Sequence, residues 1–275
     1  MTVKSQTLKV PDAQIYYEVY GSGPVLLMIP GGPADAGVFT ALARALADRY
    51  TAVPYDPRGN SRSVLGGPAE DFHLDLFGDD AAQLLAALGD QPAYVLGSSG
   101  GAQIGLNLAA RYPERVRTLV AHEPPCLELL PDAEVHRASG RELDLIYKAQ
   151  GAQAAMQKFM ASAGLDTPPP KDAPPPLEIK AAFGRMLGNL DFFFAHGRKA
   201  IVDYVPDVET LKTGRPRVVV GAGETTTGQT ANRSAVALAD RLGTPVVIFP
   251  GDHGGFGSHA AAFAERLDSV LKAGS

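Results

Sequence analysis

Six short apolar runs, bounded by glycine or proline, recur along the chain and alternate with longer amphipathic stretches. Their length and their content of β-branched residues are typical of strands buried on both faces of a sheet. Strands that alternate with helices predict a mostly parallel central sheet flanked by helices, an α/β fold with right-handed crossovers. The runs are Val25–Ile29, Thr51–Tyr55, Ala93–Leu96, Val116–Ala121, Arg217–Val220 and Pro245–Phe249.

The alternation is interrupted by a long insertion after Val116–Ala121. About ninety residues separate this run from the next, far more than an ordinary crossover needs. We therefore expect a core formed by residues 1–126 and 214–275, and an inserted helical cap formed by residues 127–213.

Two helical patterns occur within the insertion, over Glu134–Ala161 and Leu177–Arg198. The segment between them holds Pro168–Pro170 and Pro174–Pro176, which predict an extended linker. The second pattern is rich in large apolar residues, and two interpretations of them stay open. They dock the insertion onto the sheet, or they line a lid whose underside forms a pocket for an acyl chain or a ring. These residues are Phe183, Met186, Leu187, Leu190 and Phe192–Phe194.

Composition and charge exclude several classes of protein. The 275-residue chain has a formal charge of −5, and its 25 basic residues are scattered, which argues against a nucleic-acid partner. The single cysteine, Cys126, can form no intramolecular disulfide and is expected to be a buried thiol. No secretory signal is evident, and the longest apolar run, Val25–Ile29, is too short to cross a bilayer. We expect a cytoplasmic protein without membrane association.

The strongest local motif is G-x-S-x-G at Gly97, Ser99 and Gly101. It lies between a predicted strand and a predicted helix, which is the context that a nucleophile elbow requires. A sharp strand-to-helix turn strains the nucleophile's backbone, so small residues must flank it. Only Ser99 has small residues at both flanking positions, so Ser99 and not Ser98 is the expected nucleophile.

A glycine turn, Gly31-Gly32-Pro33, ends the first predicted parallel strand. Such a turn can direct backbone N–H groups at a developing oxyanion, together with the N–H of the residue after the nucleophile. Pro33 has no N–H, so we expect Gly32 and Gly100 to supply the two oxyanion-hole donors.

His253 has the sequence context of a catalytic base, since it lies in a glycine-rich loop after the last predicted strand. Its orienting carboxylate is either Glu224 or Glu123, each of which follows a predicted strand. We rank Glu224 first; it lies upstream of the histidine loop, and the chain order would be Ser, acid, His. In the loop after the second parallel strand, Asp56 and Arg58 are expected to pair and to fix the loop without a catalytic role.

These motifs together resemble the α/β-hydrolase superfamily. Gly31–Pro33 is similar to its oxyanion loop, Asp56–Gly59 to its D-x-R-G loop, Gly97–Gly101 to its nucleophile elbow and Pro250–His253 to its histidine loop. The insertion falls where the family places its cap, after the sixth strand of the family's numbering.

The chain departs from the family at three points. Pro30 stands where many members have histidine, and Glu224 stands where most have aspartate. Glu123 matches the alternative acid position of some haloalkane dehalogenases. A dehalogenase or an epoxide hydrolase is nevertheless disfavoured, because those enzymes use an aspartate nucleophile where this chain has Ser99.

The resemblance implies a cofactor-free and metal-free serine hydrolase that cleaves an ester, thioester or lactone of a small apolar or aromatic compound. Its expected partner is that small-molecule substrate, and a homodimer is compatible with the sequence. Two alternatives stay open. One is a C–C bond hydrolase or a lyase with the same triad, and the other is a receptor-like protein that binds ligands with little or no turnover.

Overall fold

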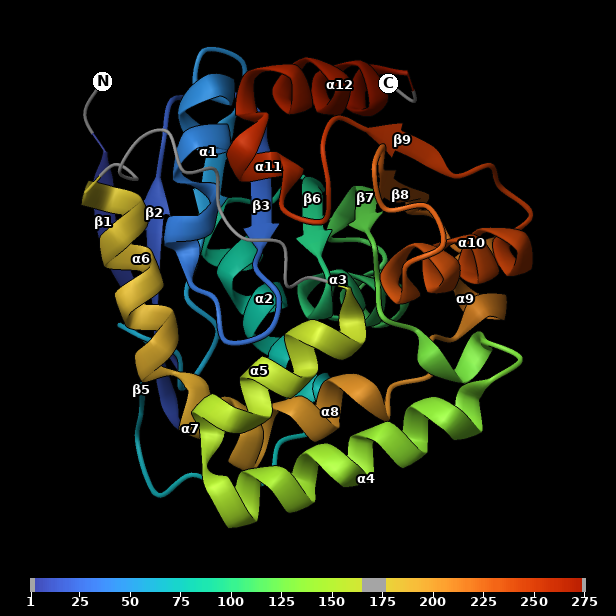
Figure 1. Ribbon diagram of the computed structural model, residues 1–275. Helices are drawn as coiled ribbons and strands as arrows, with labels where there is room; N and C mark the ends of the chain where they lie inside the picture. The colour runs from blue at the N-terminus through green and yellow to red at the C-terminus, as the bar shows by residue number, and fades with distance from the viewer. Residues whose placement is uncertain (1–2, 165–176, 274–275) are drawn as a thin grey trace.

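The computed structural model describes residues 3–164 and 177–273, and a six-stranded parallel sheet forms its centre (Figure 1). All six predicted strands are confirmed, with small differences at their ends. Every neighbouring pair of strands is parallel, in the order β4-β3-β6-β7-β8-β9. The strands are β3 (Val25–Ile29), β4 (Thr51–Pro54), β6 (Ala93–Ser98), β7 (Val116–His122), β8 (Arg217–Gly223) and β9 (Val247–Phe249).

A small antiparallel sheet accompanies the parallel one. It consists of β1 (Lys4–Val10), β2 (Ala13–Val19) and β5 (Val64–Leu65). Isolated bridges from Tyr17 to Tyr55 and from Tyr20 to Ala52 join β2 to the chain at β4.

Helices cover both faces of the parallel sheet, and the strand pleat divides the apolar residues between two cores. In β3, Leu26 and Met28 belong to one core, and Leu27 and Ile29 belong to the other. The core with Leu26 and Met28 also contains residues of α1 (Thr40–Leu46) and α12 (Ala260–Lys272). The core with Leu27 and Ile29 also contains residues of α2 (Leu74–Leu88), α3 (Gly100–Arg111) and α10 (Thr230–Leu242).

None of the described helices is long and apolar enough to cross a membrane.

The inserted segment between β7 and β8 forms a group of helices, most of which lie beyond the carboxyl ends of the strands (Figure 1). The sequence predicted a helical insertion at this point of the chain, and the described elements between β7 and β8 are helical. They are the short turn Leu127–Leu129, α4 (Ala133–Gln150), α5 (Ala152–Ala163), α6 (Leu177–Gly188), α7 (Leu190–Phe192), a π-helical turn (Phe193–Gly197), α8 (Arg198–Val202) and α9 (Val208–Thr213).

The predicted cap helices are broken where the sequence suggested continuous ones. Gly151, with φ of 86°, separates α4 from α5, because a left-handed conformation ends a helix and costs glycine little. The second pattern is likewise divided, with Asn189 between α6 and α7. The predicted proline linker lies outside the described residues.

The loop after β4 is held by two ion pairs, and they differ from the expected one. Arg58 contacts Asp80 of α2 through two hydrogen bonds of 2.6 Å, and both side chains are 2% exposed. Asp56 instead accepts hydrogen bonds of 2.8 Å from Arg62, and its Oδ1 also accepts one from the Ala36 N–H. The predicted Asp56–Arg58 pair is therefore wrong, because Arg62 and the Ala36 N–H occupy both oxygens of Asp56.

The burial of the Arg58–Asp80 pair predicts a large stability effect. Asp80→Asn should lower the free energy of unfolding by about 3 kcal/mol or more, because it leaves the Arg58 charge buried without a counter-charge. Asp79→Asn is the matched control, since the neighbouring Asp79 pairs with Arg111 at a site about one-third exposed. It should cost less than about 1 kcal/mol in denaturant titrations. Equal losses for the two variants would contradict this account.

Candidate active site

Ser99 occupies a strained turn between β6 and α3. Its φ of 55° and ψ of −127° lie in a region that non-glycine residues rarely adopt. A β-carbon on Gly97 would lie 2.4 Å from the Gly101 carbonyl oxygen, and one on Gly101 would lie 2.1 Å from the Ile29 carbonyl oxygen. The two glycines of the motif are therefore required for the turn to close, and Ser98 remains an ordinary buried strand residue.

His253 lies in the loop between β9 and the short helix α11 (Gly255–Ser258). Its Nδ1 is 2.5 Å from Oε2 of Glu123, which follows β7 directly. The Glu123 side chain is fully buried, whereas that of His253 is 18% exposed. A buried carboxylate therefore contacts the imidazole from below the surface.

Glu224, which the sequence ranked first as the partner of His253, is placed differently. Its side chain is exposed, and its backbone N–H donates to the Phe249 carbonyl oxygen at 2.9 Å. The ranking of Glu224 above Glu123 is wrong as to which carboxylate contacts His253. Strand order alone would favour Glu224, since β8 lies next to β9, but the Glu224 side chain is exposed. The buried side chain of Glu123, a residue with φ of 49°, instead reaches His253 across the end of β8.

Every oxygen of the Glu123 carboxylate has a partner. Oε1 accepts a hydrogen bond of 2.9 Å from the Gly223 N–H and also contacts the Thr226 hydroxyl, while Oε2 contacts His253. Burial alone would raise the pKa of Glu123, but the hydrogen bond and charge of His253, together with the charge of His122 and the hydrogen bond of Thr226, lower that pKa to about 2. Glu123 is therefore ionised at neutral pH.

The charge of Glu123 fixes the tautomer of His253. An ionised carboxylate can only accept hydrogen bonds, so Nδ1 of His253 must carry the proton. In the neutral ring, Nε2 is then left as a proton acceptor. This is the protonation state that a general base requires.

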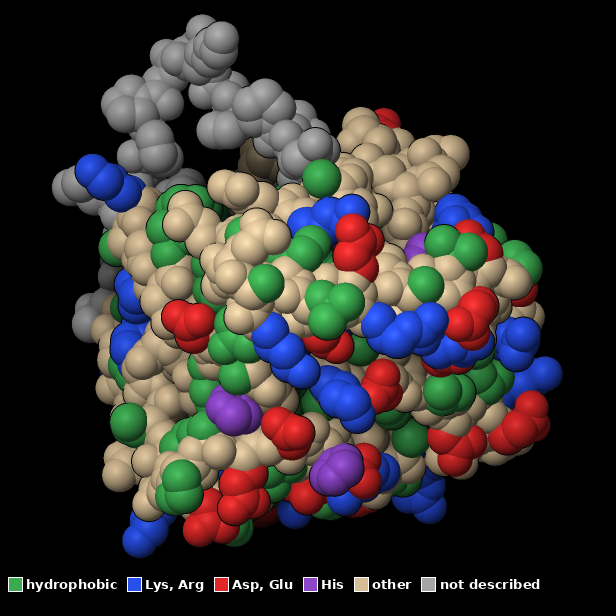
Figure 2. All heavy atoms as spheres, turned by 60° about the horizontal axis from the view of Figure 1, so that its bottom comes forward, with side chains coloured by type: hydrophobic (Ala, Val, Ile, Leu, Met, Phe, Trp, Pro, Cys, Tyr) green, Lys and Arg blue, Asp and Glu red, His purple; other side chains and the backbone are tan. Residues whose placement is uncertain are grey.

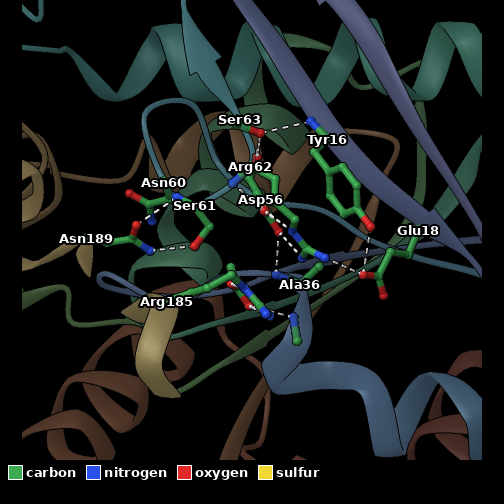
Figure 3. A network of polar contacts seen from close by, with 12 residues as sticks. Tyr16, Glu18, Ala36, Asp56, Asn60, Ser61, Arg62, Ser63, Arg185 and Asn189 are labelled. Carbon is green, nitrogen blue, oxygen red and sulfur yellow. Dashed lines mark hydrogen bonds and ion pairs between the residues drawn. The ribbon is translucent and has the colours of Figure 1, made fainter. Parts of the chain in front are cut away.

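The Gly31–Pro33 turn lies directly against Ser99 and is held by side chains. A β-carbon on Gly31 would lie 2.6 Å from the Ser99 Cβ. From the loop after β4, the Asn60 Nδ2 donates to the Ala34 carbonyl oxygen at 3.0 Å, next to the Asp56–Arg62 pair (Figure 3). The position of the turn therefore depends on the D-x-R-G loop.

Two cap residues hold the same turn, and sequence reasoning missed both. Asn189 donates to the Pro33 carbonyl oxygen at 2.7 Å and to the Ser61 hydroxyl at 2.9 Å, and it accepts from the Ser61 N–H at 2.7 Å (Figure 3). Arg185 of α6 pairs with the buried Asp35. Neither residue stands in a motif, and each lies more than 120 positions from its partner, so no local pattern could have identified them.

A cavity of about 770 Å³ opens above the elbow. Ser99, His253, Gly32 and Gly100 all line it, and most of the rest of its wall is apolar. The cavity brings together four of the six residues that the sequence singled out for chemistry. Glu123 lies behind His253, and Glu224 is not part of the wall.

The apolar cap residues divide between the two interpretations that the sequence left open. Those that line the cavity are Phe183, Met186, Leu187, Leu190 and Phe193. Phe192 instead packs against Gly59 and Phe72 of the core, whereas Phe194 stacks on Tyr147 of α4, within the cap, at 5.7 Å between ring centroids. The cap therefore uses Phe192 for docking, Phe194 for its own packing and other apolar residues for the cavity wall.

Cys126, the single cysteine of the chain, is a buried thiol, as expected. Burial raises the pKa of this thiol to about 12, so it is protonated at neutral pH. Within residues 3–164 and 177–273, no cluster of His, Cys, Asp and Glu side chains is arranged to hold a metal ion.

The comparisons with known proteins agree with the fold. Residues 24–154 match the family model of the alpha/beta hydrolase fold. An uncharacterized hydrolase of Bacillus subtilis, YraK, is 38% identical over 277 residues, which cover 99% of this chain and 97% of that protein. The chain therefore belongs to the α/β-hydrolase family of enzymes.

Solved structures show the same architecture at low sequence identity. A hydrolase from Pseudomonas aeruginosa PA01 superposes with a TM-score of 0.78 at 22% identity, over 97% of this chain and 98% of that one. The enol-lactonase from Burkholderia xenovorans LB400 superposes with a TM-score of 0.71 at 17% identity, over 97% of this chain and all of that one. These similarities concern the fold alone.

His122, the last residue of β7, is a fully buried histidine behind the site. Its ring packs edge-on against Phe249 and Phe263, and neither ring nitrogen has a hydrogen-bond partner among the described residues. Burial lowers the pKa of His122 to about 4, a shift that the nearby Glu123 charge opposes and His253 reinforces. His122 is therefore neutral in the folded protein at neutral pH.

This burial predicts a loss of stability in acid. The unfolded chain binds a proton at His122 below about pH 6.5, but the folded protein does so only near pH 4. The free energy of unfolding should therefore fall by about 3 kcal/mol as the pH drops through that window. His122→Phe keeps a ring against Phe249 and cannot be protonated, so denaturant titrations from pH 7 to pH 4 should show a smaller loss. An unchanged pH dependence would contradict the buried neutral state.

Proposed function

We propose that the protein is a serine hydrolase that cleaves an ester, thioester or lactone through a Ser99–His253–Glu123 triad. The observation that carries the proposal is the 2.5 Å contact between His253 Nδ1 and the buried carboxylate of Glu123. His253 and Ser99 line the same cavity. Glu123 replaces Glu224 as the acid of the triad.

The reaction follows from the chemistry of these groups. His253 Nε2 takes the proton of the Ser99 hydroxyl as its oxygen attacks the carbonyl carbon, and the imidazolium that forms is stabilised by Glu123. The tetrahedral intermediate collapses when His253 returns the proton to the leaving group. Water, activated by His253, then releases the acyl group from Ser99.

The oxyanion is assigned to two backbone donors beside Ser99. Gly100 is the first residue of α3, so its N–H lacks an intrahelical partner and lies at the positive end of the helix. The second donor is the N–H of Gly32, in the turn that lies against Ser99. Donors of this kind typically contribute about 3 to 4 kcal/mol each to transition-state stabilisation.

The substrate class follows from the cavity wall. Its side chains are mostly apolar, so the bound compound is apolar over much of its length. An ester, thioester or lactone needs only the acyl transfer that this triad performs. The enol-lactonase among the structural neighbours is named for a lactone, which is a cyclic ester, and this supports the same bond type.

Labelling with a fluorophosphonate tests the nucleophile. The wild-type protein should react rapidly, and mass spectrometry should place the adduct on Ser99. Ser99→Ala should abolish the labelling and lower esterase turnover by roughly 10⁶-fold, as in other triads that lose their nucleophile.

Ser98→Ala is the matched control, because Ser98 is the neighbouring serine and lies buried at the end of β6. Its effect on turnover should be small. A wild-type protein that binds ligands in the cavity but is never labelled would favour the receptor-like alternative. Labelling that survives in Ser99→Ala would place the nucleophile elsewhere.

A further inference from the structure

One permanent charge lines the cavity above Ser99, and it belongs to Arg198, the first residue of α8. The only other ionisable residue that lines the cavity among the described residues is His253. The remaining wall contains apolar, small or neutral polar side chains. A guanidinium that is the one permanent charge in such a wall favours an anion over a neutral group in its neighbourhood.

The Arg198 side chain is buried but incompletely paired. It is 5% exposed, and its Nη2 donates to the Gly140 carbonyl oxygen at 3.3 Å and pairs with the Asp144 carboxylate of α4. Its Nε is buried and has no hydrogen-bond partner among the described residues. A buried, unpaired donor on a charged group is costly, so it calls for a partner that the protein itself does not supply.

The helix that carries Arg198 lies next to the reacting groups. Ile201 of α8 covers the proposed oxyanion donor Gly100, since a β-carbon on Gly100 would lie 2.7 Å from the Ile201 Cδ1. Arg198 precedes Ile201 by three residues, less than one turn of the helix. A substrate held at Ser99 can therefore extend along the apolar wall toward Arg198.

The other basic residues that share a hollow with Arg198 are paired with acids. A second hollow of about 280 Å³ shares Arg198 with the main cavity and contains Arg137, Arg141 and Lys199. These three side chains pair with Glu134, with Glu134 and with Asp203, respectively. Figure 2 shows basic and acidic side chains interspersed on this face of the molecule. Arg198 differs from them in its burial and in its unpaired Nε.

We propose that Arg198 binds a carboxylate of the substrate. The substrate class is then an ester or lactone that is apolar near the scissile bond and carries a carboxylate at a distance from it. Asp144 keeps its place at Nη2, since it lies on the solvent side with its side chain 48% exposed, and the substrate carboxylate binds on the cavity side of Arg198. This proposal rests on the proposed function for the position of the scissile bond.

Matched esters test the charge of the substrate. The first pair is p-nitrophenyl hexanoate and the mono-p-nitrophenyl ester of adipic acid, which has a carboxylate in place of the terminal methyl group. The second pair is phenyl hexanoate and p-carboxyphenyl hexanoate, which moves the carboxylate to the alcohol side. In at least one pair, Arg198→Gln should lower the ratio of kcat/KM for the anionic ester to that for the neutral one by ten- to a hundredfold, mainly through KM.

Two control variants separate binding from packing. Arg198→Lys keeps the charge and should retain part of the preference for the anionic ester. Asp144→Asn removes the partner of Arg198 but leaves the guanidinium, so the ratio should stay at or above the wild-type value. A merely structural Arg198–Asp144 pair predicts the opposite: similar losses in both variants, and an equal loss for neutral and anionic esters.

Calorimetry on Ser99→Ala gives a second readout that needs no turnover. Adipate and hexanoate are titrated into this variant with and without Arg198→Gln, and adipate should bind ten- to a hundredfold more weakly once Arg198 is replaced. An unchanged adipate affinity together with unchanged ester ratios would overturn the assignment of Arg198. A wild-type protein that is neither labelled by fluorophosphonate nor active on any ester would instead overturn the proposed function, and the titration would still decide the role of Arg198.

Discussion

The contact between Glu123 and His253 is the interaction on which the rest of the proposed site depends. It joins the end of β7 to the loop after β9, across the end of β8. Burial of a carboxylate is unfavourable unless its oxygens are paired, and here Gly223, Thr226 and His253 pair them. The ionised state of Glu123 in turn sets the proton on Nδ1 of His253. One buried charge therefore determines the chemistry of the base.

The second constraint is the position of the glycine turn beside Ser99. Asn189 of the cap donates to the Pro33 carbonyl oxygen of the turn, Asn60 of the core donates to the Ala34 carbonyl oxygen just after it, and Arg185 pairs with the next residue, Asp35. Backbone N–H groups can stabilise an oxyanion only if the loop that carries them is held in place before the reaction. The cap thus contributes to the proposed site in two ways, through its cavity wall and through the loop it fixes.

The sequence predicted the strands, the elbow and the histidine loop, because each has a local signal: apolar runs of β-branched residues, glycines that a turn requires, and a histidine among glycines. It did not predict which glutamate contacts His253 or which aspartate contacts Arg58. Both choices depend on the direction of a side chain at the end of a strand or in a loop, which no period in the sequence encodes. Asn189 and Arg198 escaped notice for the same reason, since their partners lie far away in the chain. Gly151 did carry a local signal for a helix break, yet the apolar pattern on both sides of it concealed the break.

The most direct test of the central claim compares isosteric amides at the two glutamates. Glu123→Gln keeps the size of the side chain but removes the charge that holds the His253 tautomer, and Glu224→Gln makes the same change at an exposed position. Steady-state kinetics on one ester should show kcat reduced by about 10⁴-fold in Glu123→Gln, with little change in KM, and nearly wild-type values in Glu224→Gln. The opposite ranking, with Glu224→Gln the inactive variant, would contradict the assignment of Glu123 as the acid of the triad.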